Sequence, residues 1–203
     1  MELVIATTNK GKLREIRALL GGLDIIIKSL ADYPGCPEVV EDGASFRENA
    51  LKKAVAVAEH TGKPALADDS GLMVDALEGA PGVYSARFSG KGADDLKNNK
   101  KLLRLLKDTP DKERGAKFVC VLALAWPGEA RRRPRVFTGV VRGRIAHEMR
   151  GPRGFGYDPL FYYTRAGQTF AEMGPDEKNK VSHRARALKK LKKHLLSLLI
   201  KRK

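Results

Sequence analysis

The 203-residue sequence contains only two cysteines, and no apolar run reaches the roughly 18 residues that a membrane-spanning helix needs. Cys36 lies in a Pro-Gly-Cys-Pro stretch that predicts a loop, and Cys120 lies in an apolar stretch that predicts a buried strand. Two cysteines in such different settings argue against a disulfide or a metal site formed by the pair, and so few cysteines favour a reducing compartment. Residues 1–5 are too short to form a secretory signal. We therefore expect a cytoplasmic protein with no membrane segment.

Acidic residues are scarce in the second half of the chain. Residues 1–90 hold 10 Lys or Arg against 13 Asp or Glu, whereas residues 91–203 hold 29 against 11. The segment 178–203 alone has 11 basic residues and no acidic one. The front half is therefore suited to holding a cation and the back half to meeting an anion. A polyanionic substrate bridged by a metal ion would use both halves.

The hydrophobic pattern alternates between the periods of strands and helices. With 42% hydrophobic and 31% charged residues, the composition is that of an ordinary globular protein. This alternation predicts an α/β fold, and we expect residues 1–203 to form a single domain with one continuous core. The predicted strands are 2–7, 24–28, 64–69 (continuing extended over 71–77), 117–125 and 135–142; the predicted helices follow Asn9 and cover 45–60, 93–107 and 181–200.

The first candidate site is a strand-to-helix junction that consists of Thr7, Thr8, Asn9, Lys10, Gly11 and Lys12. Free backbone N–H groups and the helix dipole at such a junction attract phosphate, and Lys12 adds a positive charge. The segment lacks the spacing of a Walker loop. The alternative is that Asn9 caps the helix and that the lysines lie on the surface.

A group of carboxylates forms the second candidate. Two adjacent carboxylates, Asp68 and Asp69, end an apolar stretch, and burying them is costly unless they are paired or bind a metal. Neighbouring residues of a strand face opposite ways, so only one of the two should enter a site directly. Glu48 has a structural alternative, since Ser45 and Glu48 match a capping box. The other acids considered are Glu38, Glu41, Asp42 and Asp75.

Two further segments have residues suited to binding a purine. In residues 154–158 a glycine separates Phe155 from Tyr157, so an aromatic ring could stack on a flat base while Asp158 accepts from ring N–H groups. The alternative is a turn whose aromatic residues fill the core. Lys180, His183 and Arg184 are expected in the first turn of the last helix, where cations oppose the dipole unless they face an anion or ring atoms.

Taken together, these segments resemble the inosine triphosphate pyrophosphatase family. The matching pieces occur in the family's order from residue 3 to about 190, so the resemblance covers nearly the whole chain, and the ordered set is far more specific than any single piece. They are residues 7–12, 46–50, 67–72, 79–87, 154–161, 177–179 and 182–184.

The resemblance implies an elongated mixed α/β sheet with flanking helices and two lobes around a central cleft. It also implies hydrolysis of deaminated 6-keto purine nucleoside triphosphates to a monophosphate and pyrophosphate, and a homodimer. In this family pattern the segment 7–12 holds the triphosphate, Glu41 and Asp69 hold Mg²⁺, and Asp69 is the general base. The substrate would also contact Ser70, Phe155, Gly156, Tyr157, Asp158, Lys178, His183 and Arg184, the last two reading the 6-keto edge.

The Lys-rich end of the chain departs from this pattern. Leu188, Leu191, Leu195 and Leu198 form an apolar face, while lysines 189, 190, 192 and 193 cover the other side. This pattern predicts a docked helix with a solvated face. Weak nucleic-acid contact is the alternative, and a basic nucleic-acid-binding protein is the competing function, as is a pyrophosphatase for other modified nucleotides. The acidic front half and the lack of a nucleic-acid module argue against the former.

Overall fold

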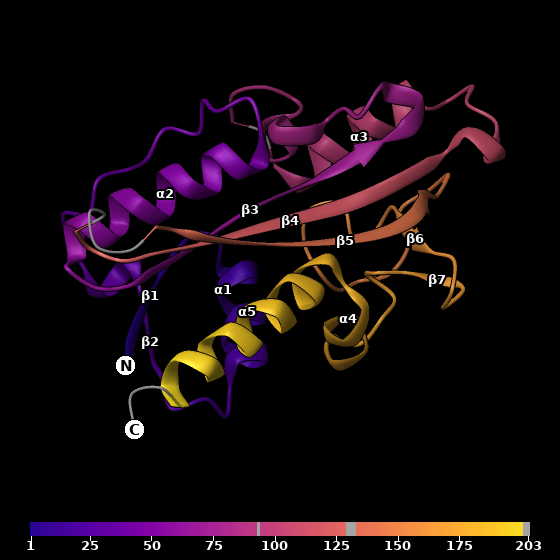
Figure 1. Ribbon diagram of the computed structural model, residues 1–203. Coiled ribbons are helices and arrows are strands. Elements are labelled where there is room, and N and C mark those ends of the chain that lie inside the picture. Colours follow the sequence, from indigo (N-terminus) through magenta and orange to yellow (C-terminus); the bar gives the residue numbers. More distant parts are fainter. Residues whose placement is uncertain (93, 129–132, 201–203) are drawn as a thin grey trace. The chain divides into compact units, whose positions relative to one another are not determined.

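The computed structural model describes residues 1–92, 94–128 and 133–200. A seven-stranded sheet has the strand order β2-β1-β3-β4-β5-β6-β7 (Figure 1). Strand β1 pairs in parallel with β2 and β3, whereas β5–β6 and β6–β7 are antiparallel, so the sheet is mixed. The predicted α/β class with a mixed sheet and flanking helices is therefore confirmed. The strands are Glu2–Ala6 (β1), Ile26–Ser29 (β2), Ala65–Val74 (β3), Gly115–Ala125 (β4), Arg135–Ile145 (β5), Phe161–Tyr163 (β6) and Gln168–Thr169 (β7).

The helices begin and end at residues whose chemistry explains their bounds. Asn9, Ser45 and Asp94 each accept a backbone N–H of the first turn of the helix that follows. Gly62 ends α2 in the left-handed conformation, which glycine adopts without a Cβ penalty. The helices are Lys10–Leu20 (α1), Phe46–Thr61 (α2), Asp95–Leu105 (α3), Pro175–Val181 (α4) and His183–Ile200 (α5), with 3₁₀ turns at Leu30–Asp32 (η1), Asp75–Leu77 (η2), Gly82–Arg87 (η3) and Asp111–Glu113 (η4).

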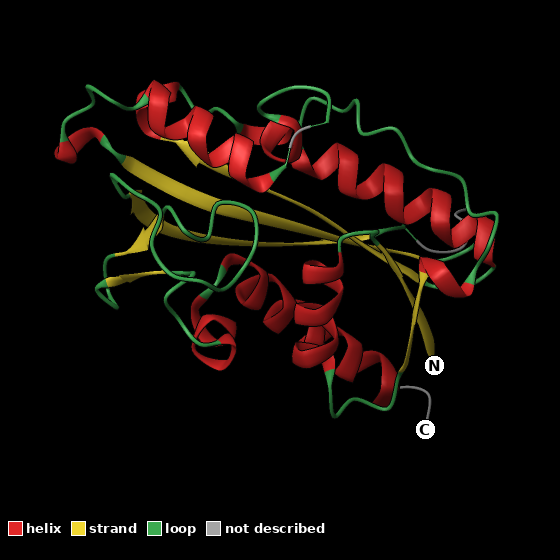
Figure 2. Cartoon of the chain, turned by 180° about the vertical axis from the view of Figure 1, so that it is seen from behind, coloured by secondary structure: helices red, strands yellow, loops and turns green. Residues whose placement is uncertain are grey.

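The chain divides into two compact units, each with its own apolar cluster. Unit 1 comprises residues 1–69, 120–139 and 184–203, and unit 2 comprises residues 70–119 and 140–183. Within these ranges, residues 93, 129–132 and 201–203 lie outside the described part. In unit 1, α2 covers one face of the sheet and α1 and α5 cover the other; in unit 2, α3 and α4 lie on opposite faces (Figures 1 and 2). The core of unit 1 includes Leu3, Leu66 and Leu188, and that of unit 2 includes Leu72, Phe118 and Phe161. That residues 1–203 form a single domain with one continuous core stays a prediction.

Several predicted boundaries were wrong. Asp68 and Asp69 lie inside a strand that continues to Val74, and residues 75–77 form a 3₁₀ turn rather than extended chain. The last helix begins at His183, so Lys180 lies in the last turn of α4, where the dipole favours a cation. The predicted start of a helix at residue 93 lies outside the described part. Strands β6 and β7 and helix α4 were missed because they are short, with 3, 2 and 7 residues.

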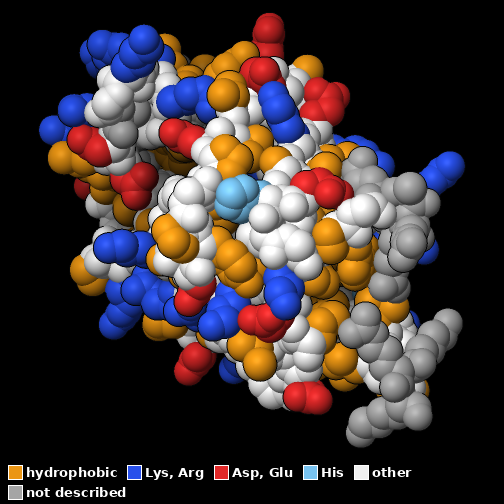
Figure 3. Space-filling model, turned by 90° about the vertical axis from the view of Figure 1, so that its left-hand side faces the viewer, with side chains coloured by type: hydrophobic (Ala, Val, Ile, Leu, Met, Phe, Trp, Pro, Cys, Tyr) orange, Lys and Arg blue, Asp and Glu red, His pale blue; other side chains and the backbone are white. Residues whose placement is uncertain are grey.

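The apolar face of α5 docks as predicted: Leu188, Leu191 and Leu195 are buried in the core of unit 1. On the face seen in Figure 3, basic and acidic side chains are interspersed, so the net positive charge is not gathered into one patch there. Within the described residues, no helix is both long and apolar enough to cross a membrane.

Candidate active site

The acidic pair lies just beyond the point where strand β1 ends. Ala6, the last residue of β1, pairs with Ala67, so Asp68 and Asp69 come next on β3, beside the turn that leads into α1. The Asn9 side chain accepts from the N–H of Lys12 at 3.0 Å, which confirms that Asn9 caps α1. Ligands of open α/β sheets bind beyond the carboxyl ends of parallel strands, so this place suits a substrate.

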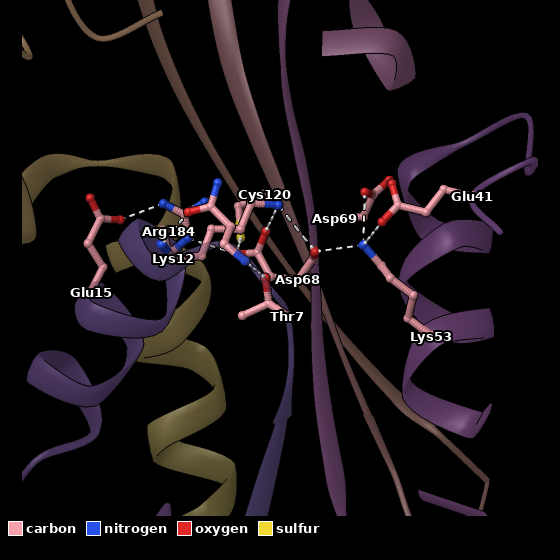
Figure 4. Close-up of polar contacts among 10 residues, drawn as sticks. Thr7, Lys12, Glu15, Glu41, Lys53, Asp68, Asp69, Cys120 and Arg184 are labelled. Atoms are coloured by element: carbon pink, nitrogen blue, oxygen red, sulfur yellow. Dashed lines mark hydrogen bonds and ion pairs between the residues drawn. The ribbon is translucent and has the colours of Figure 1, made fainter. Parts of the chain in front are cut away.

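Asp68 is fully buried and bound by two cations of unit 1 (Figure 4). Its Oδ1 lies 2.8 Å from Nζ of Lys12, and its Oδ2 accepts from Nε of Arg184 at 2.8 Å. The thiol of Cys120 also donates to Oδ2, at 3.4 Å. Arg184 uses a second nitrogen, Nη1, for the carboxylate of Glu15 at 2.5 Å. Two cations and two carboxylates therefore balance each other in this half of the cluster.

The charge state of Asp68 follows from these contacts. Burial raises the pKa of its carboxyl, but the attraction of Arg184 and Lys12 outweighs burial and holds that pKa well below its usual value. Asp68 is therefore ionised at neutral pH. Its role in this structure is to fix Lys12 and Arg184, because both of its oxygens are already used inside the protein.

Asp69 points to the opposite side of β3 and has a different environment (Figure 4). Its Oδ1 accepts from Nζ of Lys53 at 3.2 Å, and the same Nζ reaches Oε1 of Glu41 at 2.6 Å. Its Oδ2 is buried and has no hydrogen-bond partner within the described residues. Burial raises the pKa of Asp69 despite the attraction of Lys53. The prediction that the two neighbouring carboxylates face opposite ways is therefore confirmed, while the entry of only one of them into a site stays a prediction.

The backbone of Asp68 links the two halves of the cluster. Its carbonyl oxygen accepts from Nζ of Lys12 at 3.3 Å and from Nζ of Lys53 at 3.0 Å. One peptide group of β3 therefore holds two ammonium groups close to the acidic pair. Developing charge on phosphoryl oxygens is stabilised by such fixed cations.

Helix α2 holds the loop that carries Glu41. The N–H of Gly43 donates to the side chain of Asn49 at 2.8 Å, and the N–H of Ala44 donates to Glu48 at 2.8 Å. Glu48 therefore has the structural role at the start of α2: its N–H donates to the hydroxyl of Ser45, as in a capping box. Its carboxylate accepts from the N–H of Ala44 rather than from that of Ser45.

The residues of the Asp69 half fit a divalent cation. Lys53 brings one positive charge beside the carboxyl groups of Glu41 and Asp69, and no described residue donates to the buried Oδ2 of Asp69. Mg²⁺ is usually held by one or two carboxylates together with waters and substrate phosphates. No cluster of three or more His, Cys, Asp or Glu side chains placed for a metal occurs in the described part of the chain. Two carboxylates are enough only if the substrate supplies further oxygens.

A second group of predicted residues lies in unit 2 and is described by itself. Asp158 is buried, and its Oδ2 lies 2.5 Å from Nζ of Lys178 and accepts from the N–H of Phe155 at 2.9 Å. Nζ of Lys178 also lies 4.7 Å from the centre of the Phe155 ring. Gly154 has φ +80°, and a Cβ there would collide with the carboxylate of Asp158. The half-buried ring of Phe155 is therefore backed by a buried ion pair.

Tyr157 is part of the core of unit 2. Its ring is buried, and its hydroxyl donates to the carbonyl oxygen of Ser85 at 2.9 Å. Burial, with a smaller effect from Asp95, raises its pKa. His183 is also buried, and its ring stacks on Phe118 with the centroids 4.6 Å apart. Ser70 is half-buried on β3.

Two residues of the cluster, Lys53 and Glu15, were not predicted from the sequence. A signal for Lys53 exists, because it lies four residues from both Asn49 and Val57, which are buried on α2. A lysine within an otherwise buried helical stripe is costly unless it has a purpose. Glu15 gives no such signal, since a glutamate on a short helix is ordinarily solvated.

The chain was compared with protein families, curated proteins and solved structures. A model of the Ham1 family matches residues 3–194. A protein of Geobacter sulfurreducens named dITP/XTP pyrophosphatase is 57% identical over 95% of this chain and 96% of that relative, and one of Desulforamulus reducens with the same name is 52% identical over 98% of each. The solved structure of a HAM1 protein from Coxiella burnetii has a TM-score of 0.89 and 44% identity over 97% of this chain and 99% of that one. These matches confirm the resemblance that the order of the motifs indicated, and the chain belongs to the Ham1 family.

Proposed function

We propose that this protein hydrolyses deaminated purine nucleoside triphosphates, such as ITP, dITP and XTP, to the monophosphate and pyrophosphate. One structural observation supports this most directly: burial raises the pKa of Asp69, and its buried Oδ2, close to Glu41 and Lys53, has no donor among the described residues. A carboxylate in such surroundings suits proton abstraction or metal binding. The names of the relatives supply the substrate class.

In the proposed reaction, water attacks the α-phosphorus, and the bond to the oxygen that bridges the α and β phosphates breaks. Asp69 accepts the proton of the attacking water. Lys12 and Lys53, held by the carbonyl of Asp68, stabilise charge on the phosphoryl oxygens, and residues 7–12 bind the triphosphate. Glu41 and Asp69 would hold Mg²⁺, which supplies charge neutralisation on the leaving pyrophosphate when it is bound.

We assign the base and sugar to residues of unit 2. Phe155 would stack on the purine, and Gly156, Tyr157, Asp158 and Lys178 would shape its surroundings, with Ser70 as a further contact. The proximity of Nζ of Lys178 to the Phe155 ring supports this assignment, because a cation behind a ring orients it.

The 6-keto edge is assigned to His183 and Arg184. Donors there accept a keto oxygen and disfavour an amino group, which would leave a donor facing a donor. Nε of Arg184 donates to Asp68 and Nη1 donates to Glu15, so the guanidinium is held by two carboxylates.

The first experiment is incubation of the protein with ITP and Mg²⁺, with separation of the products. The proposal requires IMP and pyrophosphate. Release of IDP and orthophosphate would refute the site of cleavage, and hydrolysis of ATP as fast as ITP would refute the preference for 6-keto purines.

Matched variants test the assignment of Asp69. Asp69→Asn should lower kcat by at least about a hundredfold, because a positioned base contributes roughly 10²–10⁴ to the rate. Asp42→Asn is the control, because Asp42 lies next to Glu41 in the sequence but is exposed and forms its ion pair with Lys52. Equal activity of the two variants would remove Asp69 from the base role.

We also propose that the protein acts as a homodimer in a reducing cytoplasm. Within the described residues, Cys36 and Cys120 are not joined in a disulfide, which is compatible with such a compartment. Size-exclusion chromatography with light scattering would test the dimer, and a monomer at micromolar concentration would contradict it.

A further inference from the structure

Helix α3 carries two adjacent asparagines, both buried, that hold different loops of unit 2. The Oδ1 of Asn98 accepts from the N–H of Ser89 at 2.8 Å, and its Nδ2 donates to the carbonyl of Ala86 at 3.1 Å. The Nδ2 of Asn99 instead donates to the carbonyls of Asp95 at 2.7 Å and Gly156 at 2.8 Å. A buried amide whose two N–H groups both find carbonyls is strongly oriented.

The peptide groups of Gly156 are held from both sides by this helix. Its N–H donates to Oδ2 of Asp95 at 2.6 Å, while its carbonyl accepts from Asn99. Asn99 also binds the carbonyl of Asp95, so the two side chains are tied to the same turn of α3. Gly156 has φ +62°, a conformation that glycine adopts readily and that needs support to stay unique.

Gly156 lies between the two aromatic residues of the loop. Tyr157 is fixed in the core through Ser85, and the N–H of Phe155 is fixed by Asp158. The peptide groups between the two rings are bound through Asp95 and Asn99. Rotation of these peptide groups would turn the Phe155 ring relative to Tyr157, because the backbone has only two soft dihedrals per residue.

We infer that Asp95 and Asn99 are positioning residues that set the backbone of Gly156 and thereby present the Phe155 ring to the purine base. This inference rests on the proposed function, in which Phe155 stacks on the base. It predicts an effect on recognition of the base and none on the phosphates, because the phosphate-binding residues belong to unit 1.

The test separates the two parts of the substrate. In Asp95→Ala and Asn99→Ala, KM for ITP should rise about tenfold, the effect of losing one or two hydrogen bonds that order a loop. The inhibition constant of inorganic pyrophosphate, which has no base, should stay within about twofold, as should kcat. An unchanged KM, or an equal weakening of pyrophosphate, would overturn the inference.

Two further variants distinguish positioning from a general loss of structure. Asp95→Asn keeps an oxygen that can accept from Gly156, so it should restore KM to within about threefold of the unaltered protein. Asp94→Ala removes the cap of α3 without touching Gly156, and it should lower stability while leaving KM unchanged. Failure of Asp95→Asn to rescue, or a raised KM in Asp94→Ala, would contradict the positioning role.

A readout without catalysis keeps this inference separate from the proposed function. Hydrogen exchange at the Gly156 amide should become at least about tenfold faster in Asp95→Ala, because its acceptor is removed. Binding of the nucleoside inosine should weaken in parallel. If ITP is not hydrolysed at all, the proposed function fails, and these two measurements still decide the inference: unchanged exchange, or unchanged inosine binding despite faster exchange, would refute it.

Discussion

The replacement Arg184→Met tests the buried charge cluster of unit 1 most severely. The arginine side chain is 1% exposed, and its removal deletes the bonds from Nε to Asp68 and from Nη1 to Glu15. A hydrogen bond to a charged group contributes about 1.5–3 kcal/mol, and breaking a buried ion pair typically costs about 3–5 kcal/mol. Since Lys12 still binds Asp68 at 2.8 Å, we take the lower end and expect a loss of about 3 kcal/mol in the free energy of unfolding.

Urea unfolding followed by tryptophan fluorescence measures this loss directly. Trp126, the single tryptophan, lies in the apolar core of unit 1, the same unit as Arg184. Lys189→Met is the control: the side chain is exposed on the same helix, so the change should stay within about 0.5 kcal/mol. A loss below about 1 kcal/mol in Arg184→Met would show that desolvation of the guanidinium cancels its ion pairs, and the reasoning would fail.

The dependence on pH gives an independent check. The pKa of Asp68 is held well below its usual value, so its ion pairs stabilise the fold above about pH 4, and this contribution is lost as the pH falls through the folded-state pKa. Removing Arg184 raises that pKa. The deficit of Arg184→Met should therefore be full at neutral pH and shrink in acid, as Asp68 takes up a proton. A deficit independent of pH would point to lost packing instead.

Three further results are expected. Because burial raises the pKa of Asp69, the activity should fall in acid at a higher pH than it would with an ordinary aspartate as the base. A higher Mg²⁺ concentration should shift this fall to lower pH, since the metal favours the ionised carboxylate. A fall in activity whose pH does not depend on Mg²⁺ would contradict the proposal that Asp69 both binds the metal and acts as the base. For the same reason, the ionised Asp69 destabilises the fold at neutral pH, so Asp69→Asn should unfold at an equal or slightly higher urea concentration. A loss of more than about 1 kcal/mol in the free energy of unfolding would show that the ion pair of Asp69 with Lys53 outweighs the cost of burial. Lys178→Met removes the ammonium group that pairs with the buried Asp158, so thermal unfolding should show a loss of about 3 kcal/mol in the free energy of unfolding. Lys180→Met, which changes an exposed side chain, is the control and should leave this free energy unchanged.

Local chemistry was sufficient to predict most of the secondary structure. Asn9 and Ser45 mark the starts of two helices through short-range hydrogen bonds, and such caps can be recognised in the sequence itself. The sequence predicted extended chain after Asp69 as well, but not that one unbroken strand runs through the acidic pair to Val74. Two adjacent carboxylates favour a turn or a strand end, and only their burial among Lys12, Arg184 and Lys53 makes an interior position tolerable.

Some residues of the candidate site could likewise be predicted from local sequence, and others could not. Asp68 and Asp69 stood out because adjacent carboxylates in an apolar stretch are expensive, and strand alternation assigned them to opposite faces. Lys53 and Glu15 act on residues 12 or more positions away in the sequence, so their roles depend on the arrangement of α1, α2 and β3 in space. Asp95 and Asn99 were missed for the same reason, since Gly156 lies 61 and 57 positions along the chain.

The contrast between Asp68 and Asp69 shows where this fold contains a buried carboxylate that lowers its stability. Nearly every charge of the cluster is matched: Asp68 by Lys12 and Arg184, Glu15 by Arg184, and Glu41 by Lys53. Asp69 shares Lys53 with Glu41, and its buried Oδ2 receives no hydrogen bond from the part of the chain that the structure describes. A sequence selected for stability alone would place an amide or an apolar residue there. The cost is local, and the same strand holds the ammonium groups of Lys12 and Lys53. Under the proposed function, this oxygen of Asp69 is the atom that would accept the proton of the attacking water or bind the metal ion.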